Sequence, residues 1–183
     1  MKRALLIALV CGTPTALSAQ LGELQVGAIG SYGMRDPYRE GGGLVLGVAP
    51  GRLVYVGLRW IYYGGATSGG ANVSNRAQVF ATDFDVQIPL RGGLIELRPS
   101  IGLGMVQFVQ RGSGMTGPVS GYSKEFFAAP GLALQLSAGR VAVIPELQYY
   151  FTGHSELTWP IHNNGLAFSA RLVFLSEIRR IRR

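Results

Sequence analysis

The segment Gly165-Leu-Ala-Phe-Ser-Ala-Arg-Leu-Val-Phe174 alternates between apolar and other side chains at every second position. Residues two apart lie on the same face of a β-strand, so one face is apolar while the other carries Ser169 and Arg171. A strand of about ten residues that ends in an aromatic has the length needed to cross a bilayer at a tilt. The segment therefore predicts a membrane-crossing β-strand.

Seven earlier stretches show the same alternation, and together with the last they predict strands at 23–32, 44–48, 53–63, 80–88, 95–105, 125–136, 143–151 and 165–174. Tight turns are predicted at 49–52, 89–93 and 137–140. Longer polar or Gly-rich loops are predicted at 33–42, 64–76, 110–123 and 152–164. Short turns that alternate with long loops are typical of outer-membrane barrels. We predict an all-β fold, an eight-stranded antiparallel transmembrane up-and-down β-barrel with long external loops and short periplasmic turns.

A soluble eight-stranded barrel, such as a lipocalin-like carrier, would show the same periodicity with its apolar face inward. The composition favours the membrane alternative, because 48% of residues are hydrophobic, 15% are charged and 27 are glycine. The polar faces carry one or two charges per strand among Gly, Ala and Ser, which suits a narrow lumen better than a water-facing exterior. No mature stretch reaches the roughly 18 apolar residues of a spanning helix, so any crossing would be made by strands.

Three prolines, Pro99, Pro130 and Pro145, fall inside predicted strands. Each removes one hydrogen-bond donor from the ladder, and a closed barrel has no edge strand on which to place it. We expect β-bulges near the strand ends to accommodate them.

The two ends of the chain carry most of its net charge of +7. Basic residues precede a short apolar run, and the small residue Ala19 lies at the −1 position of a cleavage site, which predicts a cleaved signal peptide at 1–19. The barrel would then occupy 20–175, followed by a short basic periplasmic tail at 176–183. Cys11 lies in the signal peptide, so we expect no disulfide in the mature chain. The sequence has no basic face interleaved with aromatics, and we expect no nucleic-acid partner.

Charged side chains on the predicted inward faces should form a salt-bridge network, because buried charges are tolerated only when they are paired. The expected members are Glu23, Arg59, Asp83, Asp85, Glu96, Arg98, Glu146 and Arg171. Such a network would fill a lumen that eight strands leave barely wide enough for side chains, whereas porins need about twice the strands. We therefore expect no diffusion pore, and no cofactor or metal site.

Two further groups of residues should mark the membrane interfaces. Aromatic side chains that lie where strands meet long loops should form an outer girdle: Trp60, Tyr62, Tyr149, Phe151 and Phe168. Arginines in the tight turns should form a basic rim at the periplasmic side: Arg52, Arg91 and Arg140.

The closing segment, with Asn163 and Gly165 ahead of its alternating positions and Phe174 at its end, resembles the closing-strand signal of bacterial outer-membrane β-barrels. The run Arg98-Pro-Ser-Ile-Gly-Leu-Gly104 is similar to the Pro/Gly-rich strand of the small eight-stranded members. This resemblance implies a location in the bacterial cell outer membrane and insertion by the outer-membrane barrel assembly machinery. It also implies contact with outer-membrane lipids and lipopolysaccharide, and a structural or surface-interaction role through the loops.

Some eight-stranded outer-membrane barrels are lipid A deacylases or acyltransferases with a His/Ser pair near the membrane surface. The last predicted loop offers His154, Ser155 and His162 for such a role. Because His154 and Ser155 are adjacent, they would point in opposite directions on an extended segment. We interpret both histidines as solvated loop residues and keep a lipid A-modifying enzyme as the alternative.

Overall fold

The computed structural model describes residues 21–50, 53–65, 67–68, 72–91, 94–114, 117–155, 157, 161 and 163–177. The predicted signal peptide, Arg52, His162 and the arginines at 179–183 lie outside these ranges, as does the side chain of Arg91. Within the described part of the chain, no helix is long and apolar enough to span a membrane.

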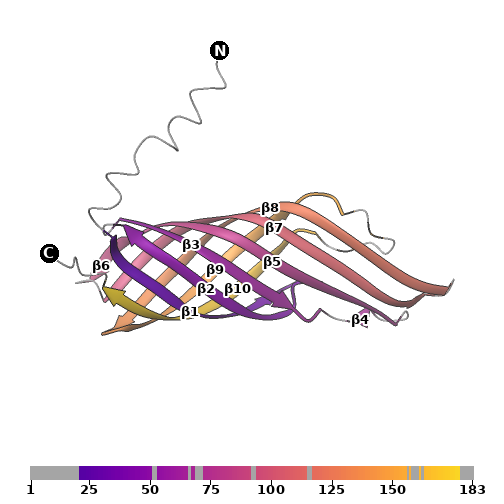
Figure 1. Cartoon of the computed structure of the whole chain (residues 1–183), viewed down its shortest axis with the longest axis horizontal. Helices are drawn as coiled ribbons and strands as arrows, with labels where there is room; N and C mark the ends of the chain where they lie inside the picture. Colours follow the sequence, from indigo (N-terminus) through magenta and orange to yellow (C-terminus); the bar gives the residue numbers. More distant parts are fainter. Residues whose placement is uncertain are drawn as a thin grey trace, which may run out of the picture.

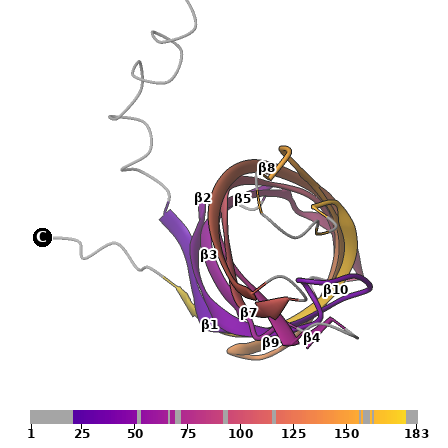
Figure 2. The ribbon, with the colours of Figure 1, turned by 90° about the vertical axis from the view of Figure 1, so that its right-hand side faces the viewer.

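The strands form one continuous antiparallel sheet that closes on itself (Figures 1 and 2). The elements are β1 (Leu21–Gly33), β2 (Glu40–Pro50), β3 (Val54–Tyr63), β4 (Thr67–Ser68), β5 (Asn72–Val86), β6 (Ile88–Arg91), β7 (Ile95–Gly114), β8 (Gly117–Ala138), β9 (Val141–Thr152) and β10 (Gly165–Glu177). β5 and β6 pair with successive parts of β7 in one register, and β4 adds two residues beside β5. The prediction of an eight-stranded antiparallel barrel is confirmed.

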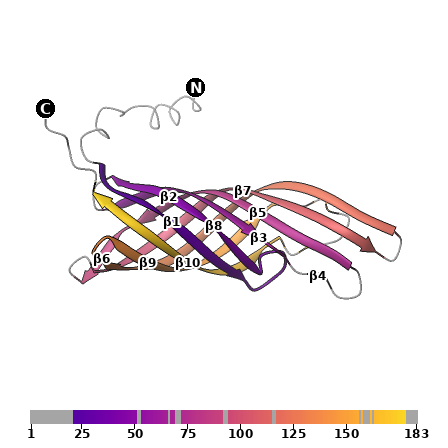
Figure 3. The same ribbon diagram turned by 60° about the horizontal axis from the view of Figure 1, so that its bottom comes forward.

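The barrel closes where the first strand meets the last (Figure 3). β1 pairs with β10 without a break from Glu23↔Glu177 to Gly33↔Ala167. Each barrel strand therefore has a neighbouring strand on both sides, and these neighbours satisfy the backbone donors and acceptors of the sheet.

On all eight barrel strands, the side chains point to the sides of the sheet that the sequence predicts. Residues assigned to the apolar face lie on the outside of the barrel, as shown by Leu44, which is 61% exposed. Their neighbours point into the lumen, where Ile61 is 0% exposed. The barrel thus has an apolar exterior and a buried interior that holds both apolar and charged side chains.

The strand ends that the short connections join lie at one end of the barrel, at the left of Figure 1. These ends are Pro50 and Val54, Arg91 and Ile95, and Ala138 and Val141. Gly139 has a φ of 65°, a left-handed conformation that favours glycine in this tight turn. The strand ends beside the longer connections lie at the other end: Gly33 and Glu40, Tyr63 and Asn72, and Thr152 and Gly165.

The predicted third loop, 110–123, is wrong, because β7 and β8 continue as a paired hairpin through Gln110↔Gly121 to Gly114↔Gly117. β5 also starts earlier than predicted and pairs with the same extension from Asn72↔Ser113 onward. Small and polar side chains fill this region, so the apolar alternation disappears while the backbone ladder continues. The resulting sheet projects beyond the rest of the barrel at the right of Figure 1.

The expected β-bulges at the prolines are also wrong. Pro130 and Pro145 both lie on the β8–β9 seam, where pairing is interrupted at each proline within the described strands. The register is the same on both sides of each gap, for example at Ala128↔Phe151 and Gly131↔Gln148. The seam therefore tolerates the missing donors by local loss of pairing.

Pro99 lies opposite the break that separates β5 from β6. Asp85↔Ser100 and Ile88↔Leu97 flank this break in one register. On the other side of this strand the β3 register continues past the break, and the Gln87 backbone N–H donates to the carbonyl oxygen of Leu53 at 2.8 Å. The fourth barrel strand is divided where Pro99 supplies no donor.

Neighbouring strands approach so closely at Gly43 that a larger residue would require the backbone to shift. A Cβ on Gly43 would overlap the backbone carbonyl oxygen of Trp60, whereas a Cβ on Gly30 would meet no atom within 4 Å. We expect Gly43→Ala to lower the free energy of unfolding in detergent by about 1–3 kcal/mol, since the strand must shift. Gly30→Ala is the control and should change it little. Equal unfolding midpoints for the two variants would contradict this backbone contact.

Candidate functional site

A cluster of six charged side chains crosses the middle of the barrel interior. Three arginines and three carboxylates contribute to it from five strands: Arg59 (β3), Asp83 and Asp85 (β5), Arg98 (β7), Glu146 (β9) and Arg171 (β10). All six are buried, with Arg98 0% and Arg171 1% exposed. The formal charges of the cluster balance, which buried ionic groups require.

Arg171 is the shared member of this cluster. Its Nε donates to Oε2 of Glu146 at 2.8 Å, and its Nη2 lies 2.7 Å from the same oxygen. Its Nη2 also lies 3.6 Å from Oδ2 of Asp83, and its Nη1 lies 3.5 Å from Oδ2 of Asp85. One guanidinium on the closing strand therefore contacts all three acids.

Arg59 holds the side of the cluster nearer the long connections. Its Nη2 donates to Oδ1 of Asp83 at 2.6 Å, and its Nη1 donates to Oε1 of Gln148 at 2.6 Å. Nη1 also lies 3.5 Å from Oε1 of Glu146. Arg59 thus links β5 to β9 across the lumen.

Arg98 holds the side of the cluster nearer the short turns. Its Nη2 lies 3.3 Å from Oδ2 of Asp85, and its Nη1 donates to Oε1 of Gln135 at 2.6 Å. The Tyr55 ring packs between two arginines, with its centroid 4.6 Å from Cζ of Arg98 and 6.0 Å from Cζ of Arg171. Such cation–π contacts gain strength when water is excluded.

Two of the predicted network members, Glu23 and Glu96, form no salt bridge with a described arginine. Glu23 accepts a hydrogen bond from Nε2 of Gln25 at 2.8 Å. Both carboxylates are only partly buried, because they lie in the first residues of β1 and β7, near the end of the barrel where the short turns are. Their membership of the network therefore stays a prediction.

An aromatic layer lies on the side of the charged cluster that faces the long connections. Its centre is Tyr38, from the β1–β2 connection, which is 1% exposed. Its ring stacks on Tyr150 at 5.1 Å between centroids and meets the edges of Tyr63 at 5.5 Å and Phe108 at 6.0 Å. Burial raises the pKa of the Tyr38 phenol, so it stays protonated and donates to the carbonyl oxygen of Asn163 at 3.1 Å.

Tyr38 was not among the predicted site residues, because the polar, turn-rich segment 33–42 predicts a loop. One signal was available, since Tyr38 is the only aromatic side chain in that segment. Hydroxyl groups join this layer to the strands: Ser169 donates to Ser31 at 2.8 Å, and Ser31 lies 2.8 Å from the Tyr63 hydroxyl.

The last connection carries the residues of the enzymatic alternative. His154 is exposed, whereas the Ser155 hydroxyl donates to Oδ1 of Asn163 at 2.8 Å. Asn163 also donates from Nδ2 to the carbonyl oxygen of Gly153 at 2.6 Å, and its own carbonyl accepts from the Thr152 hydroxyl. Ser155 therefore belongs to a loop-stabilising set of hydrogen bonds, and no bond joins it to His154 among the described residues.

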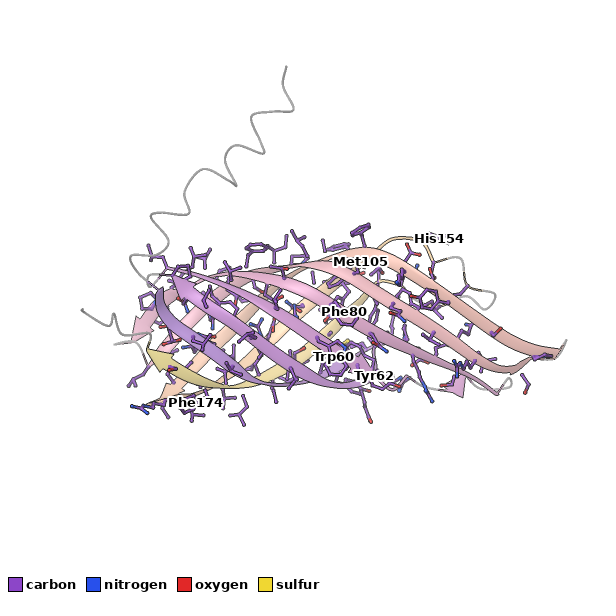
Figure 4. All side chains as sticks on the ribbon, in the orientation of Figure 1. Trp60, Tyr62, Phe80, Met105, His154 and Phe174 are labelled. Atoms are coloured by element: carbon purple, nitrogen blue, oxygen red, sulfur yellow. The ribbon has the colours of Figure 1, made fainter. Side chains whose placement is uncertain are left out.

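The predicted girdle residues all lie on the outer wall. Figure 4 shows Trp60 and Tyr62 there beside Phe80 and Met105, with Phe174 near the end that carries the short turns. The rings of Tyr149 and Phe151 meet at 4.6 Å. Arg140 is exposed in the β8–β9 turn. That these side chains mark the two interfaces stays a prediction.

The described residues contain no group of three or more His, Cys, Asp or Glu side chains placed to hold a metal ion. The buried carboxylates instead all face guanidinium groups. Chemically, the cluster can join strands across the lumen and neutralise its own charge.

The Arg171 contacts predict a large effect on stability. Arg171→Ala would leave three buried carboxylates facing two arginines, and this uncompensated charge should lower the free energy of unfolding by on the order of 3 kcal/mol. Arg140→Ala removes an exposed arginine and should change it little. Denaturant titration in detergent compares the two, and equal midpoints would show that the cluster does not hold the barrel together.

No protein-family model and no curated protein matches the chain. Solved structures do match it. The N-terminal β-barrel domain of Pseudomonas aeruginosa OprF aligns with a TM-score of 0.61 at 11% identity, over 86% of this chain and 98% of that one. A major outer membrane protein from Thermus thermophilus gives 0.60 at 12% identity, over 85% and 99%.

The attachment invasion locus protein Ail of Yersinia pestis, in complex with the heparin analogue sucrose octasulfate, gives a TM-score of 0.51 at 14% identity, over 85% of this chain and 99% of that one. At these identities the likeness concerns the fold. The chain has the fold of the small eight-stranded outer-membrane β-barrels.

Proposed function

We propose that the protein is an integral protein of the bacterial outer membrane whose lumen is filled by side chains. It acts structurally, or through its outer loops, rather than as a diffusion pore. The observation that carries this proposal is the inverted distribution of side chains, with three arginines buried inside and leucines exposed outside.

The outer wall supports the membrane location. Large apolar side chains are exposed on every barrel strand, for example Leu58 at 60% and Leu172 at 57%. Soluble monomers rarely expose apolar patches larger than a few hundred Å², so a wall of this kind favours contact with lipid. One of the similar solved structures, from Thermus thermophilus, is a major outer membrane protein.

Two successive layers support a closed lumen. The charged cluster joins strands across the interior, and the layer around Tyr38 lies between this cluster and the long connections. A barrel of eight strands leaves an interior just wide enough for side chains. Together, these layers occupy the route that an ion would take.

The partners follow from the same surfaces. Outer-membrane lipids and lipopolysaccharide would cover the wall, and the assembly machinery would act on β10, where Phe174 is exposed near the end of the strand. A role in surface interactions rests on the projecting β7–β8 hairpin and on the similar fold of Ail, which was crystallised with a sulfated ligand. The hydrogen bonds of Ser155 favour a structural last loop over a catalytic one.

Because the lumen is closed, we predict that the barrel conducts no ions. Purified mature protein in planar bilayers should give no stepwise ionic current. Tyr38→Ala should also be silent, because Tyr63, Tyr150 and the arginines remain beneath it. Tyr122→Ala, on the outer face, is the matched control. Stable current steps that grow with salt concentration, seen for the unsubstituted protein, would contradict the proposal.

A structural role for the last loop predicts that His154→Ala leaves lipid A unchanged. Cells that express the protein and cells that express this variant should show the same lipid A acylation pattern by mass spectrometry. A pattern that changes with the protein and reverts in the variant would instead establish the enzymatic alternative.

A further inference from the structure

The outer wall of the barrel is hollowed on one side by an apolar groove of about 690 Å³. One border of this groove is a row of outward side chains that crosses four strands in register. Leu44 pairs with Trp60, Trp60 with Phe80, and Phe80 with Met105. Figure 4 shows the last three following one another across neighbouring strands.

The second border is the next outward row, two residues away on each strand. Leu46 pairs with Leu58, Leu58 with Thr82, and Thr82 with Leu103. Thr82 is the smallest side chain of this row and lies between two leucines. The groove is therefore a continuous apolar channel between two rows, with a low point at Thr82. Its volume falls within the roughly 300–1,000 Å³ of ligand pockets.

The groove becomes polar on the side of the long connections. Gln107 and Lys124 are cross-strand partners that line it there. Gln107 also borders two smaller hollows of about 160 and 510 Å³, and Arg111 lines both of them. Arg76 lines the smaller one. Three exposed cations, Arg76, Arg111 and Lys124, thus surround the polar end of the groove.

This cationic group has little opposing charge on its own face. Within the described strands β1 to β8, Glu40 is the one carboxylate that points outward, and β3 separates its strand from β5. Glu125 is adjacent to Lys124 but turns inward and accepts from the Ser123 hydroxyl at 2.5 Å. None of the three cations forms a salt bridge with a described residue.

We propose that this groove binds one phosphorylated, acylated lipid of the outer leaflet. One acyl chain lies between the two apolar rows, and the phosphate groups meet Lys124, Arg111 and Arg76. The proposal rests on the outer-membrane location proposed above, which places a lipid headgroup on the side of the long connections. Charge complementarity selects the occupant, since a neutral lipid would fill the groove but offer the three cations no anion; the Lys124 ammonium otherwise contacts only the Tyr122 ring, 5.6 Å from its centroid, among the described residues.

The test uses the folded mature protein, bisphosphorylated lipid A as the probe, and native mass spectrometry to count retained lipids. We expect one lipid A per chain. Lipid A with its phosphates removed should be retained about tenfold less, because charge-assisted hydrogen bonds are lost. Inorganic phosphate should not displace the lipid, which separates the lipid from free phosphate as the source of the anion.

Two pairs of variants locate the site. The double substitution Lys124→Gln with Arg111→Gln, and separately Thr82→Phe, should each lower retention about tenfold or more. The controls are Arg140→Gln, in the β8–β9 turn at the other end of the barrel, and Ala170→Phe, on another part of the outer wall. Both should leave lipid A retention unchanged.

Equal retention in all variants, or equal retention of lipid A with and without phosphates, would overturn the inference. Insertion into phosphatidylcholine vesicles, read as faster migration of unboiled samples in gels, is measured on the same preparations. A barrel that inserts but retains no lipid A contradicts this inference alone. A barrel that fails to insert contradicts the proposed membrane location.

Discussion

Closure of the sheet is the constraint on which the rest of the structure depends. A hydrocarbon environment offers backbone N–H and C=O groups no water, so a membrane-crossing sheet must end on itself. Here β1 and β10 complete the ring over an unbroken ladder. With eight strands, the ring leaves an interior that its own side chains must fill. At position 43 the neighbouring backbone lies so close that a Cβ would meet it.

The charged cluster explains how charged side chains can fill the interior without leaving a charge unpaired. Arg171 lies on the closing strand, and its three acids come from β5 and β9. These contacts form only when the strands surround a common lumen, so they favour the closed register over slipped pairings. Buried ion pairs contribute little net stability compared with apolar packing, and we attribute to this cluster the specificity of closure.

Much of this architecture could be predicted from the sequence, because successive side chains of a strand point to opposite faces. Apolar and polar residues therefore alternate with a period of two. The facing of Arg59, Arg98 and Arg171 followed from the neighbouring apolar positions. The projecting hairpin did not, since its backbone ladder needs no apolar residues. The in-register gaps at Pro130 and Pro145 also escaped prediction, because a missing donor can be tolerated by a bulge or by lost pairing. Tyr38 and the wall groove depend on contacts between segments far apart in the chain.

We infer that the apolar face of each strand meets lipid while the arginine-bearing face meets the lumen. Nitroxide labels placed one at a time along β10, at 168–173, would report this through their accessibility to oxygen in lipid vesicles. We expect a period of two, with high accessibility at Phe168, Ala170 and Leu172 and low accessibility at the positions between them. High accessibility at Ser169, Arg171 and Val173, or no periodicity, would contradict it.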